Sequence, residues 1–492
     1  MRQCAIEVMS KHYDLAVIGG GSGGVGAALA AARLGVSVVL IEKGGCLGGT
    51  SVRAGVNCWE MGAGGTGIPF DLYRRLKKIP KAVGIYSFGR HGSWYKPDRE
   101  PYRFPGGELV IDPRRRYVDT LQRHVPEGTA KTEAFCREHW HGVPFEPDAM
   151  ARVMQESLAG TGHCTLMLNT AFVKLRHSAG RIESIELNNS ATITADAYVD
   201  STADALVCLA AGCELMVGQE AQDRFGEPSA PAKANKRVNG VSLIYRVTRK
   251  ESSAVDPLPG CIPVECWWAK RFAWAHMFHY PCGDWNINVL PTMEGEEFLR
   301  LGYAAAYAEC KGRVQAHWHH LQTHYAEFRD FRLSWIAPML GIRESRRVVG
   351  EHVLTQHELL AGCSGQKHPD IIAIADHSMD THGASTGRAG TGEVREPYGV
   401  PYRCLIPKGF KNLLIACRGA SFSSLAASSC RLSRTMIQLG QAAGTAVTLA
   451  KKLNVSLPEV PAGQLREALR KQHAQVDWPT LPALREHLLA EG

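Results

Sequence analysis

Residues 13–42 read YDLAVIGGGSGGVGAALAAARLGVSVVLIE, and this stretch decides the fold. Its first part, Leu15–Ile18, is a short apolar run that ends at glycine, which indicates a buried parallel strand. The alanine-rich run Val25–Leu34 predicts a helix. A second β-branched run, Ser37–Ile41, predicts another strand that Glu42 closes. The pattern is therefore a strand–turn–helix–strand unit.

The turn before the helix has the spacing of a dinucleotide-binding loop. Gly19 permits a tight turn, Gly21 lets the backbone approach a pyrophosphate, and Gly24 lets the helix pack closely on the strand. With Ser22, these residues open a helix whose N–H groups and dipole favour phosphate. Glu42 lies about twenty residues further on, where an acid accepts hydrogen bonds from ribose hydroxyls. FAD and NAD both use this unit.

Composition limits the class of protein. The chain has 492 residues, 45% hydrophobic and 21% charged, as expected for a globular protein with a large core. No run of about eighteen apolar residues or secretory signal peptide is evident, so we expect no membrane insertion. The net charge of +8 is mild and does not favour nucleic acid. Fifteen scattered cysteines without a CxxC pair indicate reduced thiols and a cytoplasmic protein.

The predicted fold class is α/β, with a Rossmann-like dinucleotide-binding domain and a second α+β substrate domain. An alternating strand at Val241–Val247 and a long helix from about Gly295 to Phe328 belong to the second domain. The predicted division is a discontinuous dinucleotide-binding domain at 11–65, 150–220 and 396–455, an irregular insertion near the active site at 66–149, a substrate domain at 225–395, and a helical tail at 456–492.

The segment after Glu42 distinguishes the two dinucleotides. Residues 43–51 read KGGCLGGTS, and this GxGxxG…Glu…Gly-Gly arrangement resembles the FAD-binding half of glutathione-reductase-like flavoproteins. In the disulfide-reductase branch of that group, two redox cysteines follow. Ser51 and Val56 stand at the matching positions here, so the sequence does not favour a disulfide reductase.

Further segments resemble a broad family of FAD-dependent oxidoreductases, in the same order along the chain from about residue 13 to 450. They are DSTAD at 200–204, GIRESRR at 341–347, DTHG at 380–383, PYRCLIP at 401–407, NLLIACR at 412–418 and LGQAAG at 439–444. The chain departs from the family pattern at Ser201, Ala203 and Cys417. A second strand–GxGxxG–helix unit is missing from the sequence, so a dedicated NAD(P) domain is not expected.

The resemblance implies non-covalent FAD and a set of binding residues. The AMP half of FAD would contact the glycine turn and Glu42, and the backbone at Val173 would lie beside the adenine. The full predicted set is Gly19, Gly21, Ser22, Gly24, Glu42, Lys43, Gly49, Thr50, Ser51, Val173, Thr202, Asp204, Arg418 and Ala426, the last in the turn before the final long helix.

Three residues are candidates for catalysis. His382, in the DTHG segment, is our first candidate for the base, because a neutral imidazole takes a proton near pH 7. Arg343 either clamps a substrate carboxylate or forms a salt bridge with a neighbouring glutamate. It is four residues before Arg347 on a predicted helix or turn, so the two would share a face. Arg403 is a candidate through the resemblance alone.

Two clusters have alternative interpretations. His317, His320 and His324 would share a helix face, but we expect no metal there, because no complete set of ligands accompanies them. The tryptophans of the second domain form either core packing or an aromatic wall for a ring-shaped substrate. They are Trp267, Trp268, Trp274 and Trp285, near His276 and His279.

The resulting hypothesis is an FAD-dependent oxidoreductase that transfers a hydride between a small organic substrate and the flavin. The alternatives are an NAD-dependent dehydrogenase on the same turn and a flavin-binding protein without redox activity. The motifs leave the electron acceptor or donor and the oligomeric state open.

Overall fold

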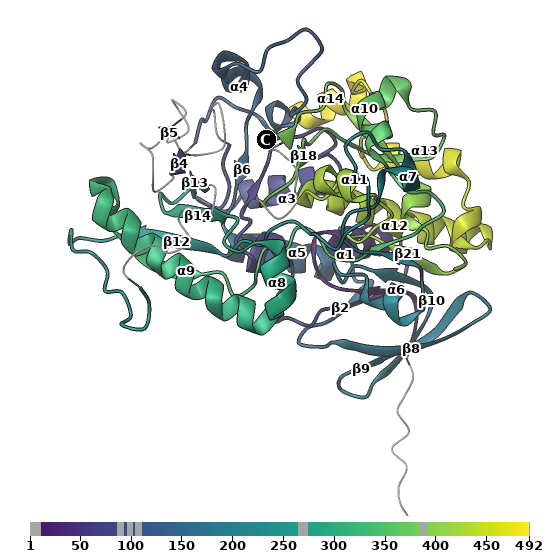
Figure 1. Cartoon of the computed structure of the whole chain (residues 1–492). Helices are drawn as coiled ribbons and strands as arrows, with labels where there is room; N and C mark the ends of the chain where they lie inside the picture. Colours follow the sequence, from purple (N-terminus) through teal and green to yellow (C-terminus); the bar gives the residue numbers. More distant parts are fainter. Residues whose placement is uncertain are drawn as a thin grey trace, which may run out of the picture.

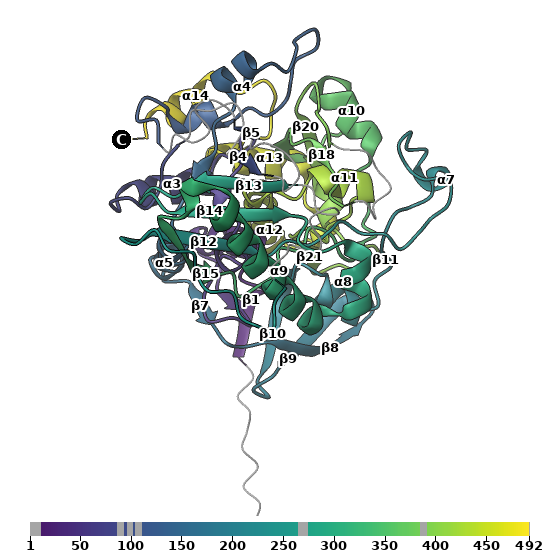
Figure 2. The ribbon, with the colours of Figure 1, turned by 60° about the vertical axis from the view of Figure 1, so that its left-hand side comes forward.

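The computed structural model describes residues 11–85, 93–95, 102–103, 111–263, 274–383 and 391–491 (Figures 1 and 2). Its larger sheet has seven strands: β1 (Lys11–Ile18), β2 (Val38–Ile41), β7 (Cys164–Met167), β8 (Phe172–Ser178), β9 (Arg181–Leu187), β10 (Thr192–Asp200) and β21 (Leu413–Ile415). The strand order is β7-β2-β1-β10-β9-β8, and β21 pairs with the end of β10. Strands β7, β2, β1, β10 and β21 run parallel, whereas β8 and β9 form an antiparallel hairpin.

Helices cover the parallel strands, and every residue of β2 is therefore buried. Helix α1 (Ser22–Arg33) follows β1 and packs against α12 (Ser433–Leu453). A Cβ atom on Gly440 would lie only 1.9 Å from the carbonyl oxygen of Gly23. Glycine at this crossing therefore lets the two helices touch along their backbones.

The second sheet has six antiparallel strands in the order β15-β12-β14-β13-β4-β5. They are β4 (Ser93–Tyr95), β5 (Tyr102–Arg103), β12 (Ile244–Arg249), β13 (Trp274–His279), β14 (Trp285–Leu290) and β15 (Phe331–Ile336). Helices α8 (Gly295–Leu301) and α9 (Tyr303–His324) accompany this sheet, and α9 contributes Val314 and Trp318 to its separate hydrophobic core. Figure 1 shows α9 running along this sheet, away from the seven-stranded sheet.

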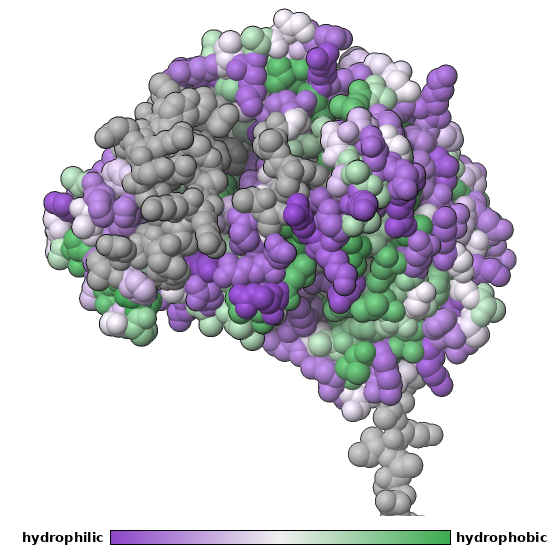
Figure 3. All heavy atoms as spheres, viewed as in Figure 1, coloured by the Kyte–Doolittle hydropathy of each residue, from purple (hydrophilic) through white to green (hydrophobic). Residues whose placement is uncertain are grey.

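Shorter elements connect and flank the two sheets. They are α2 (Thr50–Arg53), β3 (Cys58–Trp59), α3 (Ile68–Lys77), α4 (Glu133–His139), β6 (Val143–Pro144), α5 (Pro147–Ala159), α6 (Leu206–Ala210), β11 (Leu215–Met216), α7 (Gln222–Phe225), β16 (Arg347–Val348), α10 (Gln356–Gly365), β17 (Ile371–Ala375), β18 (Met379–Asp380), β19 (Thr391–Gly392), β20 (Tyr398–Pro401), α11 (Ser424–Ser429), α13 (Ala462–Lys471) and α14 (Pro482–Leu489). Among the coloured residues of Figure 3, hydrophilic ones (purple) are widespread, and hydrophobic ones (green) gather at the lower right. Across the described ranges, no helix is long and apolar enough to cross a membrane.

The structure confirms the α/β class and the strand–turn–helix–strand unit, but it corrects three local predictions. The long helix predicted from Gly295 is two helices, because Gly302 has a φ of 74° that ends α8. The strand predicted from Val241 begins at Ile244. Residues 341–346 are not helical, so Arg343 and Arg347 do not share a helix face.

The seven-stranded sheet draws on three separate stretches of the chain. Its strands come from residues 11–41, 164–200 and 413–415, and each range falls within one predicted block of the dinucleotide-binding domain. The domain boundaries themselves stay a prediction.

Candidate active site

A cavity of about 1060 Å³ lies at the carboxyl ends of β1, β2 and β10, where open α/β sheets bind ligands. The six-stranded sheet supplies a second wall through Ser242, Ile244, His276 and Asn288. Pockets for one drug-sized ligand measure roughly 300–1,000 Å³. The volume of the cavity is at the upper end of this range.

The glycine turn has the shape that a pyrophosphate needs. Gly19 has a φ of 103°, and a Cβ atom there would lie 2.3 Å from the carbonyl oxygen of Ser201. A Cβ atom on Gly24 would lie 1.8 Å from the carbonyl oxygen of Gly19. Gly21 lines the cavity, and a Cβ atom there would have no neighbour within 4 Å. The turn is thus packed on the strand side and open on the cavity side, which fits a dinucleotide.

Glu42 lies at the same end of the cavity and is buried. Its Oε2 accepts a hydrogen bond from the N–H of Gly20 at 2.7 Å, and its Oε1 accepts one from Gly44 at 2.6 Å. These bonds fix the carboxylate beside the turn, and its contact with ribose stays a prediction. Val173 is 53% exposed and does not line the cavity, whereas the preceding residues 170–172 do.

The other predicted FAD contacts divide into two groups. Ser22, Lys43, Gly49, Thr50, Thr202, Asp204 and Arg418 line the cavity together with Gly19, Gly21 and Glu42. Asp204 accepts a hydrogen bond from Arg418 at 2.6 Å, and Arg418 Nε is buried without a partner among the described residues. Gly24, Ser51 and Ala426 are outside the lining. Ser51 instead donates to Ser433, and Ala426 is buried inside α11.

His382 lies in the cavity wall and is held by Asp380. Its Nε2 is 2.6 Å from Asp380 Oδ2, and the same oxygen accepts a hydrogen bond from Arg431 at 2.8 Å. Burial opposes ionisation of Asp380, but His382 and Arg431 outweigh it and hold the pKa of this carboxyl far below its usual range. Burial lowers the pKa of His382 below 6.5, although Asp380 raises it. The imidazole is therefore neutral near pH 7.

Arg343 also lines the cavity. Its Nη1 donates to the carbonyl oxygen of Gly240 at 3.0 Å and to Ser242 Oγ at 3.1 Å. Burial, with the nearby charge of Arg431, lowers its pKa to about 10, so the guanidinium stays charged at neutral pH. Arg347, by contrast, is buried away from the cavity and pairs with Glu220 and Glu344.

A second charged group at the cavity was missed by sequence reasoning. Glu60 accepts a hydrogen bond from His377 Nε2 at 3.0 Å, and Glu393 pairs with both Arg123 and Lys131 at 3.0 Å. These residues come from regions without a recognisable motif, and their contacts span about 260 residues or more. No local pattern could have brought them together.

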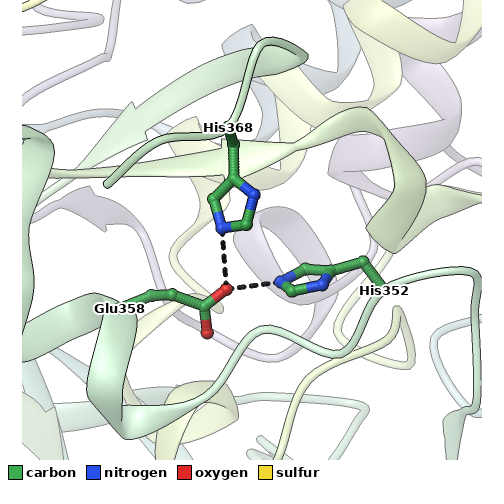
Figure 4. A group of neighbouring side chains, drawn as sticks. All are labelled: His352, Glu358 and His368. Atoms are coloured by element: carbon green, nitrogen blue, oxygen red, sulfur yellow. Dashed lines mark hydrogen bonds and ion pairs between the residues drawn. The ribbon is translucent and has the colours of Figure 1, made fainter. Parts of the chain in front are cut away.

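Arg403 lies outside the cavity, so the structure does not bring it to the other candidates. Its Nε donates to Asp370 at 3.1 Å, and its Nη2 is 3.1 Å from His368 Nδ1. His368 belongs to a group with His352 and Glu358 whose ligand atoms are close enough to hold a metal ion (Figure 4). Because Arg403 only donates, His368 Nδ1 accepts, and the Nε2–H donates to Glu358. The hydrogen bonds thus satisfy the group, and a metal on Nε2 would conflict with Arg403.

The predicted histidine face on α9 serves packing. His317 Nδ1 is 2.7 Å from the hydroxyl of Tyr245, and burial lowers the pKa of His317 to about 3. The rings of His320 and His324 stack with centroids 4.0 Å apart. Among the predicted aromatic residues, Trp285 packs on Phe328 and Phe331, whereas Trp267 and Trp268 are outside the described residues.

Three kinds of comparison show which known proteins the chain resembles. A family model described as FAD dependent oxidoreductase matches residues 14–469. A 3-oxosteroid 1-dehydrogenase of Mycobacterium tuberculosis (strain ATCC 25618 / H37Rv) is 35% identical over 104 residues, which are 20% of this chain and 17% of that protein. The mitochondrial dihydrolipoyl dehydrogenase of Schizosaccharomyces pombe (strain 972 / ATCC 24843) is 54% identical over 44 residues, 9% of each protein. The matches thus span less than a fifth of these curated relatives.

Among solved structures, a geranylgeranyl bacteriochlorophyll reductase-like protein from Thermoplasma acidophilum aligns with 98% of this chain and 87% of its own. The sequence identity is 13% and the TM-score is 0.46. The family model matches residues 14–469, which is nearly the whole sequence. The chain therefore belongs to the FAD dependent oxidoreductase family.

Proposed function

We propose that this enzyme transfers a hydride between a small organic substrate and FAD, and that His382 takes or returns the substrate proton. The observation that carries the proposal is the position of the His382–Asp380 pair in the same cavity as the Gly19–Gly24 turn. One cavity thus combines a dinucleotide cradle with a proton acceptor.

The residues that would hold FAD follow from the cavity lining. The turn from Gly19 to Gly23 would receive the pyrophosphate and Glu42 the ribose, with the adenine near residues 170–172. Gly49, Thr50, Arg418 and the start of α12 would contact the flavin half without a covalent bond. When bound, FAD supplies a carrier that accepts or donates a hydride.

His382 has the tautomer of a general base. Its Nε2–H donates to the ionised Asp380, which leaves Nδ1 with a free lone pair in the neutral ring. Nδ1 can then accept a proton from a substrate O–H or N–H while the adjacent carbon loses its hydride. Asp380 stabilises the imidazolium that forms and fixes the ring orientation. Asp380 is therefore a positioning residue that acts through His382.

The test is anaerobic reduction of the bound flavin by a panel of alcohols and amines. We expect at least one compound to bleach the flavin, and His382→Gln to slow this bleaching roughly 100-fold or more at unchanged FAD occupancy. His163→Gln, a change at an exposed histidine, is the matched control and should leave the rate unchanged. Equal bleaching rates in wild type and His382→Gln would show that His382 is not the base.

A further inference from the structure

The charged groups at the substrate end of the cavity are mostly paired, and Arg343 differs from the rest. Arg431 pairs with Asp380, and Arg123 and Lys131 pair with Glu393. Each carboxylate there also contacts a second donor. In the part of the chain that the structure describes, Arg343 donates only to neutral oxygens and has no carboxylate partner.

Arg434 also lines the cavity without a carboxylate partner among the described residues, but its terminal nitrogens are occupied. Nη1 donates to Thr120 Oγ1, and Nη2 donates to the carbonyl oxygens of Thr120 and Glu60. Arg343 uses only Nη1 for its two bonds, so the N–H groups of Nε and Nη2 remain as donors for a ligand. Burial of this cation is costly, and the charges of Asp380 and Glu60 offset the cost only in part, so a ligand carboxylate would stabilise it further.

The six-stranded sheet places a polar strip beside Arg343. Ile244 is opposite Asn288, and Asn288 is opposite His276, so the three side chains form a row on one face of the sheet. Ser242, which accepts from Arg343, is two residues before Ile244 and also lines the cavity. All four residues line the cavity. Asn288 lines the cavity, and its Oδ1 is buried without a hydrogen-bond partner among the described residues.

We propose that the substrate is an organic acid whose carboxylate binds the guanidinium of Arg343, with a neutral donor of the same molecule on Asn288. Guanidinium binds carboxylate through two parallel N–H bonds, which orients the ligand as well as holding it. A single guanidinium with unused N–H groups matches a carboxylate better than a phosphate, which carries more charge. The inference rests on the proposed function for the redox step and adds the class of substrate.

The test measures binding rather than turnover. The full-length, FAD-loaded enzyme is titrated with acetate and phenylacetate, and separately with the neutral acetamide and phenylacetamide, and the visible flavin spectrum is recorded. We expect at least one acid to perturb the spectrum in a saturable way, and its amide to bind at least about tenfold more weakly. Calorimetric titration of the same acids checks the affinity without the flavin signal. Inorganic phosphate should bind more weakly than the acids.

Three variants identify the group that binds the acid. Arg343→Gln should remove the preference for acid over amide, and Arg343→Lys should retain part of it, because lysine keeps the charge and loses the fork. Arg395→Gln, an exposed arginine paired with Glu127, is the matched control and should bind like wild type. FAD occupancy and circular dichroism show whether each variant is folded.

The outcomes separate this inference from the proposed function. Equal binding of acids and amides, no binding of either acid, or a preference that survives in Arg343→Gln would overturn the organic-acid proposal, even if a neutral compound reduces the flavin. Acid binding that depends on Arg343 supports the proposal, even if no compound reduces the flavin through His382. A neutral alcohol that reduces the flavin at the same rate in Arg343→Gln as in wild type would be compatible with the proposed function. It would contradict the proposal that the substrate is an organic acid.

Discussion

At the scale of single residues, Asp380 orients His382 and opposes the effect of burial on its pKa. The carboxylate also contacts Arg431, and the two partners hold its own pKa far below the usual range. His382 is subject to opposing effects, since burial and Arg343 lower its pKa whereas Asp380 raises it. The net result is a pKa below 6.5, which keeps the base form present at neutral pH.

This balance predicts how activity depends on pH. The base form of His382 persists above its pKa, so kcat/KM should be constant near neutrality and fall about tenfold per pH unit once the pH drops below a value under 6.5. Asp380→Asn removes the charge that raises this pKa and should move the acid limb to lower pH. Arg343→Gln removes a charge that lowers it and should move the limb to higher pH. Shifts in the opposite directions would contradict the assignment.

Ala203 is strained in a way that a stability measurement can reveal. It has a φ of 69°, in the left-handed region that favours glycine. A left-handed conformation costs a non-glycine residue roughly 1–2 kcal/mol. Ala203→Gly should therefore raise the free energy of unfolding by about 1 kcal/mol, after the greater entropy of glycine in the unfolded chain is subtracted.

Urea unfolding of the variant measures this effect. Ala305→Gly, in an exposed and regular part of α9, is the control and should lower stability by about 1 kcal/mol. A loss of stability in Ala203→Gly similar to that of the control would mean that Ala203 is not strained.

At the scale of elements, the contact between α1 and α12 holds the dinucleotide turn in place. A methyl group on Gly440 would meet the Gly23 carbonyl oxygen, and this backbone cannot move without shifting the start of α1. Gly440→Ala should lower stability by about 1–3 kcal/mol and reduce FAD occupancy.

Thermal unfolding and flavin content of the purified variant test this prediction. Gly463→Ala in α13 is the matched control, because a Cβ atom there meets no atom within 4 Å. The control should keep its flavin and gain up to about 1 kcal/mol of stability. If Gly440→Ala behaves like the control, the two helices are not in close contact.

The elements that sequence predicted well are those specified locally. The unit at residues 13–42 is specified by β-branched runs, an alanine-rich helix and a glycine turn, which all occur within one short stretch. The break at Gly302 was missed because the apolar spacing continues through it, and glycine inside a helix is tolerated at moderate cost. Several side chains in residues 341–346 favour a helix, but the segment is not helical. Arg343 donates to Ser242 and Arg347 donates to Glu220, so tertiary contacts override local propensity.

At the scale of the whole molecule, the site exists because two sheets with separate cores meet at one cavity. The sequence predicted the dinucleotide side of this cavity, since its glycines and Glu42 occur in one short stretch. It also named His382 and Arg343 through motif resemblance. It missed Arg123, Lys131 and Glu393, whose pairing depends on how distant segments fold together. Arg403 lies outside the cavity and donates to Asp370, because a motif match does not show which way a side chain faces.

The measurement that tests the central claim most directly is the flavin content of Gly21→Asp. Residue 21 is the N-cap of α1 in an extended conformation, where aspartate is favoured, and its side chain would enter the open cavity and repel a pyrophosphate. Gly463→Asp adds the same side chain to the first turn of α13, where nothing lies within 4 Å, and is the control. We predict one flavin per chain in wild type and in Gly463→Asp, and a folded, colourless Gly21→Asp. A Gly21→Asp protein that retains a full equivalent of flavin would contradict the placement of FAD on this turn.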